Sequence, residues 1–129
     1  MPKKSEVKIL ERDIKAAVLQ AVNLSKRIVA WPQPTGVGRT MDGKRVIRYG
    51  VPGQADITGI VMIDDATATF DPNARVIGVR LEIEVKSATG RQSDEQKAFQ
   101  AMIDRHGSVY LLVRSAQDAV AQLKARGLW

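Results

Sequence analysis

Hydrophobic side chains near the start of the chain recur at the spacing of one helix face. In residues 5–24, SEVKILERDIKAAVLQAVNL, apolar positions fall three and four residues apart, and Ser5 can cap the first turn. These positions are Val7, Leu10, Ile14, Ala17, Val18 and Ala21. At about 100° per residue, Glu11 falls between Val18 and Val22 on this apolar arc. Because an unpaired charge there is costly, Glu11 needs a basic partner, a metal ion, or a place at the margin of the arc where it reaches solvent.

Short apolar runs, separated by glycine and proline, predict strands through the middle of the chain. The predicted strands cover residues 27–31, 44–51, about 56–63 and about 75–87, the last being the longest. Prolines and glycines in PQPTGVGR predict a loop that ends in Arg39. Asp56 stands at the entrance of a strand, and the turn-rich residues that follow residue 63 predict a hairpin connection.

The longest predicted strand has alternating side chains in the stretch LEIEVK. The apolar residues at 81, 83 and 85 fall on one face, and Glu82, Glu84 and Lys86 fall on the other. A solvated sheet face would explain this pattern, because antiparallel sheets often have one wet side. The alternative is that the charged face belongs to a functional site.

Helix signals frame the C-terminal third. Ser93 and Gln96 have the spacing of a capping box, which predicts a helix over DEQKAFQAMIDRH that Gly107 ends. SVYLLVRS then predicts a buried strand, and Ser115 caps a last short helix. A helix between two strands predicts a β-α-β crossover with parallel neighbouring strands. The single histidine, His106, lies at the predicted helix end, where a hydrogen bond or a favourable charge explains it better than catalysis.

Composition narrows the classes of function. The 129 residues suffice for one domain, which we assign to 1–129. Cysteine is absent, which excludes disulfides, thiolate metal sites and cysteine nucleophiles, so a bound metal would need oxygen ligands. We expect neither a signal peptide nor a membrane span, and a location inside a cell. The net charge of +6 makes a polyanionic partner plausible.

Two carboxylates on neighbouring predicted strands suggest a metal site. Asp56 and Glu84 can together hold Mg²⁺ or Mn²⁺, and a backbone carbonyl such as that of Val85 can complete the ligand set. Lys86, two residues after Glu84, could orient or deprotonate an attacking water, or offset charge that develops on a phosphate.

These residues resemble the PD-(D/E)XK nuclease superfamily, and within it the VRR-NUC domain. The resemblance covers most of the chain, in the order ERDIKAAVL, GVGR, RYGVPGQADITGI, EIEVK, GRQSDEQKAF and GSVYLLVRS. It implies a restriction-endonuclease-like α/β fold, with an α-β-β-β-α-β core and a central mixed sheet flanked by helices. By position, Asp56 and Glu84 resemble the metal ligands, Lys86 the catalytic lysine and Gln96 the helix glutamine that faces the site. Glu11 resembles the carboxylate of the first helix, and Glu82 falls at a variable position, where we expect it to be solvated.

The resemblance implies a Mg²⁺-dependent DNA endonuclease, in which Mn²⁺ can substitute. Standalone members of this size resemble Holliday-junction resolvases, so a homodimer that cuts branched DNA is expected, encoded by a phage or prophage and acting in the bacterial cytoplasm. For Gln96, helix capping alone is an alternative to a role in the site. The alternative to an enzyme is a basic nucleic-acid-binding module that keeps the fold without turnover.

Basic and aromatic residues outside the metal site suggest how partners bind. Arg39, Arg45, Arg48 and Arg91 could contact DNA phosphates from loops around the site, although a generic basic surface would look the same. Trp31 and Trp129 are candidates for the dimer surface, with packing onto their own domain as the alternative.

Overall fold

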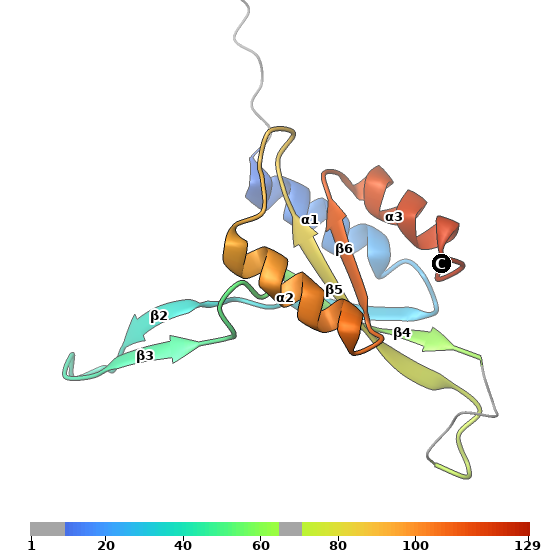
Figure 1. Cartoon of the computed structure of the whole chain (residues 1–129), viewed down its shortest axis with the longest axis horizontal. Coiled ribbons are helices and arrows are strands. Elements are labelled where there is room, and N and C mark those ends of the chain that lie inside the picture. Colours follow the sequence, from blue (N-terminus) through green and yellow to red (C-terminus); the bar gives the residue numbers. More distant parts are fainter. Residues whose placement is uncertain (1–9, 65–70) are drawn as a thin grey trace, which may run out of the picture.

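Helices lie on both faces of a four-stranded sheet, and a separate two-stranded ribbon projects from this body (Figure 1). The computed structural model describes residues 10–64 and 71–129. In chain order the elements are α1 (Glu11–Val22), β1 (Ile28–Pro32), β2 (Gly36–Arg39), β3 (Val46–Tyr49), β4 (Ile57–Ile63), β5 (Ile77–Val85), α2 (Asp94–Arg105), β6 (Val109–Val113) and α3 (Ala116–Ala125).

The main sheet is mixed and has the strand order β1-β4-β5-β6. Strand β4 pairs antiparallel with β1 and with β5, whereas β6 runs parallel to β5. Helix α2 connects β5 to β6, so the predicted β-α-β unit with parallel strands is confirmed. The β4–β5 register places Ile57 opposite Ile83 and Thr58 opposite Glu82, which brings the start of β4 beside the end of β5.

Two groups of apolar side chains attach the helices to the sheet. Val18 and Val22 of α1 pack with alternate residues of β5 and with α3 in the larger core, which also contains Leu81, Ile83, Val85, Ala119 and Leu123. Phe99 and Ile103 of α2 pack against Tyr110 and Ala55 in a smaller core. Because strand side chains alternate, the residues of β5 between the apolar ones face α2. The last five residues of β5 are therefore all buried.

The helix boundaries follow the sequence signals closely. Ser93 and Gln96 form the predicted capping box, and Gly107 follows α2 with a φ of 75°. His106 is the C-cap residue of α2, and its Nδ1 lies 2.7 Å from the Met102 carbonyl oxygen. This contact agrees with the predicted hydrogen bond at the end of the helix. Ser115 accepts a hydrogen bond from the Asp118 amide at the start of α3. Helix α1 is the exception, because it begins at Glu11 and the predicted helix over residues 5–24 is wrong at Leu10, which is extended and is the N-cap; the predicted cap Ser5 lies outside the described residues.

The prediction of a loop up to Arg39 is wrong over its second half. Gly36–Arg39 form β2, which pairs antiparallel with β3 to make the two-stranded ribbon. A Cβ atom on Gly36 would lie 2.9 Å from the Tyr49 hydroxyl, because the Tyr49 ring covers the strand where glycine has no side chain. This cross-strand cover compensates for the low strand propensity of glycine, and no local pattern reveals it.

The two tryptophans differ in their surroundings. Trp129 is partly buried and packs against the larger core of its own domain, which agrees with the alternative to an interface role. Trp31 on β1 keeps 41% of its surface exposed. In the described ranges, none of the helices has the length and apolar character that crossing a membrane requires.

Candidate active site

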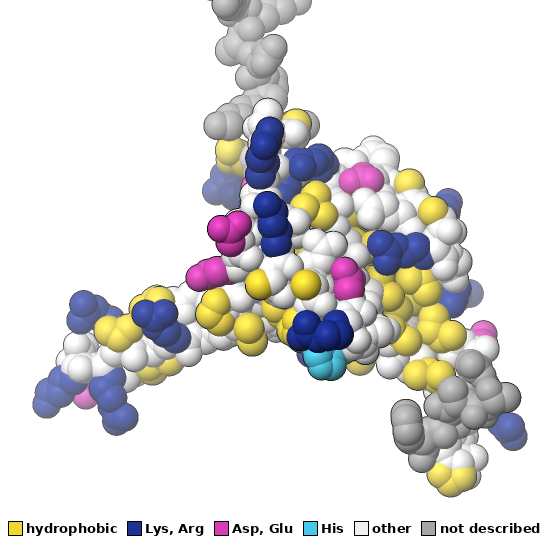
Figure 2. Space-filling model, viewed as in Figure 1, with side chains coloured by type: hydrophobic (Ala, Val, Ile, Leu, Met, Phe, Trp, Pro, Cys, Tyr) yellow, Lys and Arg dark blue, Asp and Glu magenta, His cyan; other side chains and the backbone are white. Residues whose placement is uncertain are grey.

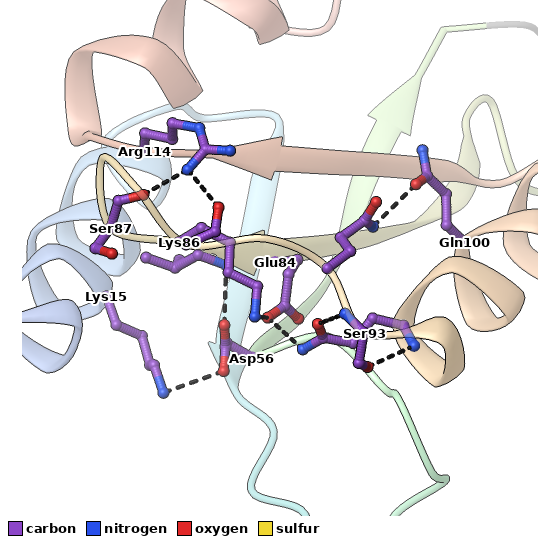
Figure 3. Close-up of polar contacts among 12 residues, drawn as sticks. Lys15, Asp56, Glu84, Lys86, Ser87, Ser93, Gln100 and Arg114 are labelled. Atoms are coloured by element: carbon purple, nitrogen blue, oxygen red, sulfur yellow. Dashed lines mark hydrogen bonds and ion pairs between the residues drawn. The ribbon is translucent and has the colours of Figure 1, made fainter.

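Asp56 and Glu84 meet where β4 begins and β5 ends (Figure 3). Asp56 precedes β4 by one residue, and the antiparallel register carries it past the Ile57–Ile83 pair toward the end of β5. One carboxylate oxygen of Asp56, Oδ2, accepts a hydrogen bond of 2.9 Å from the Val85 amide. The backbone of β5 thus fixes the Asp56 carboxylate beside Glu84, which is the neighbouring residue in that strand.

Glu84 is a buried carboxylate with one satisfied and one unsatisfied oxygen. Only 2% of its surface is exposed. Its Oε1 accepts a hydrogen bond of 2.9 Å from Gln96 Nε2 and lies 3.5 Å from the Lys86 ammonium. Its Oε2 is buried and has no hydrogen-bond partner among the described residues. Burial, reinforced by the negative charge of Asp56, raises the pKa of Glu84 from 4.5 to about 7.

Lys86 lies in the site, as the sequence predicted from its spacing to Glu84. Its side chain is 13% exposed and forms an ion pair with Glu84. Its backbone amide donates a 3.0 Å hydrogen bond to the Val113 carbonyl, which extends the contact between the ends of β5 and β6. The backbone of Lys86 is therefore fixed by β6, and its ammonium is held by the Glu84 carboxylate.

Gln96 makes both contacts that the sequence left as alternatives. Its Oε1 accepts a hydrogen bond of 2.8 Å from the Ser93 amide and thereby closes the capping box. Its Nε2 donates to Glu84 at 2.9 Å. Helix α2 therefore begins at the site, and one side chain caps the helix and orients the carboxylate.

Lys15 is a site residue that the sequence analysis missed. Its ammonium lies 3.1 Å from Asp56 Oδ1, so each Asp56 oxygen has a partner. On the same helical count that singled out Glu11, Lys15 lies within about 20° of Val22 on the apolar arc. Lys15, one turn after Glu11, could therefore have been named from the sequence as a second charged residue beside the apolar arc. Glu11 itself is exposed on the first turn of α1, one turn before Lys15 on the same side of the helix.

The expectation of a solvated strand face is wrong for Glu82. None of its surface is exposed, because it lies on the face of the sheet that α2 covers by packing against the neighbouring strand β6. Its carboxylate accepts hydrogen bonds of 3.1 Å from Thr58 Oγ1 and 2.6 Å from Arg80 Nε. Burial raises the pKa of Glu82, while these donors act in the opposite direction. Alternation along one strand could not show which face a later helix would cover.

The segment between β5 and α2 is fixed beside the site by Arg114, which directly follows β6, and by side chains of β6 and α2. Arg114 donates hydrogen bonds from Nη1 to the carbonyls of Ser87 and Gly90, the latter at 2.8 Å (Figure 3). Gln92 donates to Gln100 and to the Tyr110 hydroxyl. This segment carries the exposed Arg91, the only one of the four predicted DNA-binding arginines that lies in it.

The other three predicted DNA-binding arginines lie on the ribbon. Arg39 ends β2, Arg48 lies in β3, and Arg45 directly precedes β3. All three are exposed. These arginines were expected in loops around the site, and they lie instead along the projecting ribbon.

The candidate site offers two carboxylates to a divalent cation. Asp56 and Glu84 form a pair, and the described residues contain no group of three or more acidic, histidine or cysteine side chains suited to a metal. A third protein ligand would therefore have to be a backbone oxygen, such as the Val85 carbonyl. The buried, unpartnered Oε2 of Glu84 is what a carboxylate built for a hard cation would show. The residues fit Mg²⁺, which keeps several waters and needs few protein ligands.

Comparison of the chain with protein-family models, with curated proteins and with solved structures finds no match. The fold and site define a mixed α/β domain in which an acidic pair, a lysine and a glutamine meet at one end of the two central strands, β4 and β5.

Proposed function

We propose that the chain is a metal-dependent nuclease that hydrolyses phosphodiester bonds in DNA. The observation that carries the proposal is the Glu84 carboxylate, which is 2% exposed beside Asp56 and leaves Oε2 unpartnered within the described part of the chain. Asp56 beside it is partly exposed, and two adjacent carboxylates repel each other, so a metal ion bound by both would lower the cost of burying Glu84. The same proposal assigns the observed mixed α/β architecture to the restriction-endonuclease-like fold.

Asp56, Glu84 and the Val85 carbonyl would hold the cation. When bound, Mg²⁺ would supply Lewis acidity and a water of lowered pKa, and Mn²⁺ would serve in its place. The Val85 amide holds Asp56 Oδ2, and Gln96 holds Glu84 Oε1, so both carboxylates are oriented before any cation arrives. This arrangement lowers the cost of ordering the ligands.

Lys86 is the residue best placed to act on the reacting groups. Its ammonium lies 3.5 Å from Glu84 Oε1, so it sits at the acidic pair and remains 13% exposed to an approaching substrate. A cation in that position can orient an attacking water and offset negative charge that builds up on a phosphate in the transition state. This role depends on position, and arginine would not reproduce the compact charge of lysine.

Charge supports a polyanionic substrate such as DNA. The chain has a net charge of +6, and exposed basic side chains occupy the ribbon and the segment before α2. Cutting both strands of a branched substrate at symmetric positions would need two such sites, so the proposal includes a two-fold dimer. Exposed apolar side chains on β1 and β4 (Val29, Trp31 and Ile60) offer a surface for it.

Cleavage assays with matched variants test the proposal. Labelled four-way junctions and linear duplexes are incubated with Mg²⁺ or with EDTA, using the wild type, Asp56→Asn, Glu84→Gln and Lys86→Ala. Asp104→Asn is the control for the two carboxylate variants, because it removes the same charge from an exposed position on α2. We expect cleavage that needs Mg²⁺, is lost in the three site variants and survives in the control. A folded wild type that binds DNA and cuts none of these substrates would leave the non-catalytic binding module as the better description.

A further inference from the structure

The ribbon of β2 and β3 is the most exposed part of the described chain. It forms its own two-stranded sheet and projects away from the body (Figure 1). All four residues of β3 are exposed, and its apolar side chains Val46 and Ile47 keep 58% and 49% of their surface in solvent. A lone two-stranded ribbon is marginally stable in water, so exposed apolar groups along it indicate a surface that a partner covers.

The ribbon is strongly basic. Between Gly36 and Tyr49 it carries four basic residues, Arg39, Lys44, Arg45 and Arg48, and a single acidic one, Asp42. Asp42 is engaged in the turn, where it accepts hydrogen bonds from the Thr40 hydroxyl and, at 3.0 Å, from the Lys44 amide. The local excess of three positive charges is half of the net charge of the chain. Figure 2 shows these basic side chains gathered toward the end of the ribbon.

The register distributes side chains unequally between the two faces of the ribbon. Val37 pairs with Arg48, and Arg39 pairs with Val46, so these four side chains share one face. Each strand contributes one arginine and one valine to it. On the other face, Gly36 and Gly38 of β2 lie opposite Tyr49 and Ile47, so β2 contributes no side chain to that face and the Tyr49 ring lies over its glycines. A ribbon with arginines on both strands can reach phosphates on both sides of a groove.

Both roots of the ribbon are attached to the candidate active site. On the incoming side, the Gln33 amide donates a 2.8 Å hydrogen bond to the Asp56 carbonyl. On the outgoing side, Gly53 (φ +77°) lies so close to α2 that a Cβ atom there would be 2.2 Å from the Glu95 carbonyl oxygen and 2.7 Å from the Gln96 nitrogen. The direction of the ribbon is therefore set by the residues that build the site.

We propose that the ribbon is a DNA-binding arm that enters a groove of B-form duplex next to the phosphate being cut. This inference rests on the proposed nuclease function and specifies which substrate feature the chain recognises. The major groove of B-DNA, about 12 Å wide, admits a two-stranded ribbon, whereas the major groove of A-form RNA is too narrow for side chains to enter. A second copy of the ribbon does not fit as the partner, because each ribbon carries a net charge of +3 and the two would repel each other. Arg39 and Arg48 contact the phosphates, and Met41, at the tip, extends furthest along the groove.

Duplex binding in EDTA tests the arm independently of the metal site. Arg39→Ala/Arg48→Ala is compared with Lys124→Ala/Arg126→Ala, which removes the same charge from the end of α3, far from the ribbon in Figure 1. Losing two phosphate contacts should lower the slope of log K against log[salt] by about 1.8 and weaken binding by tens of fold at about 0.1 M salt. The control should change both far less. A wild type that binds no duplex, a ribbon variant equal to its control, or tighter binding of duplex RNA than of duplex DNA would overturn the proposal.

The absence of cysteine from the chain allows the tip to be located directly. A Met41→Cys variant carries an iron–EDTA conjugate that cuts nearby DNA by generating radicals, and Ala121→Cys, exposed on α3, carries the same conjugate as a control. We expect cuts within the bound duplex from position 41 and background cutting from position 121. Equal patterns would overturn the placement of the ribbon.

The two proposals fail in different experiments. Mg²⁺-dependent cleavage by the wild type tests the nuclease, and ribbon-dependent duplex binding in EDTA tests the arm. Cleavage with ribbon-independent binding would remove the arm and keep the nuclease. Ribbon-dependent binding without cleavage of any substrate would remove the nuclease and keep the ribbon as a DNA-binding element.

Discussion

Replacing Glu84 by glutamine should stabilise the metal-free protein at alkaline pH while removing its activity. The folded state raises the pKa of Glu84 from 4.5 to about 7, so it binds this proton more tightly than the unfolded chain does. The contribution to stability is therefore fully present below about pH 4.5 and is lost as the pH rises through about 7. A difference of about 2.5 pKa units at about 1.36 kcal/mol each gives an upper limit of about 3 kcal/mol at pH 8.

Glutamine removes this cost and keeps the hydrogen bond from Gln96, while it replaces the ion pair with Lys86 by a neutral contact. Its carbonyl oxygen can still accept the hydrogen bond from Gln96 Nε2, which in the wild type measures 2.9 Å. We expect Glu84→Gln to be more stable than the wild type by about 1–3 kcal/mol at pH 8 in EDTA, and to gain little at pH 5. For a domain of this size the gain corresponds to a rise in Tm of roughly 3–10 °C.

Thermal unfolding in EDTA at pH 5 and pH 8 measures the effect. Asp104→Asn serves again as the control, because its carboxylate is exposed and we expect no comparable gain. A Glu84→Gln variant that is no more stable than the wild type at pH 8, or equally stabilised at both pH values, would refute the reasoning. It would show that the folded chain already compensates the charge of Glu84 without a cation.

Three further predictions concern the same site. Mg²⁺ should raise the Tm of the wild type more at pH 8 than at pH 6, because a proton competes for Glu84 below its pKa of about 7; an equal rise at both values would count against Glu84 as a ligand. Ca²⁺ should support DNA binding with little cleavage, since it is larger and a poorer Lewis acid, and equal cleavage rates in the two ions would contradict this mechanism. Glu11→Gln should slow cleavage at unchanged Tm if the first turn of α1 serves the site, whereas an unchanged rate would assign Glu11 to the solvent-exposed surface.

The acidic pair and the lysine could be predicted because their signals are local. Alternation fixed the side of β5 on which Glu84 and Lys86 lie, and the turn before β4 marked Asp56. The capping box likewise predicted the start of α2, since both partners lie within one turn. In each case the residues that decide the structure are close neighbours in the sequence.

What could not be predicted depends on contacts between distant segments. Glu82 was assigned to solvent because its burial requires α2 to pack against β6 on that face of the sheet, and both elements come later in the chain. Strand β2 was read as loop because Tyr49 stabilises it from more than ten residues away. Lys15 could have been found, since the helical count placed it about 20° beyond Val22, at the margin of the apolar arc, but its contact with Asp56 depends on the packing of α1 against the sheet.

Binding of Mn²⁺ to the protein without DNA tests the central claim most directly, because it does not depend on choosing the right substrate. Electron paramagnetic resonance of free Mn²⁺ is followed during titration of the wild type, Asp56→Asn, Glu84→Gln and the control Asp104→Asn at pH 8. The account predicts saturable binding in the wild type and the control, and loss of that binding in both site variants. Absence of saturable binding in the wild type, or equal binding in all four proteins, would contradict the assignment of Asp56 and Glu84 as a cation site.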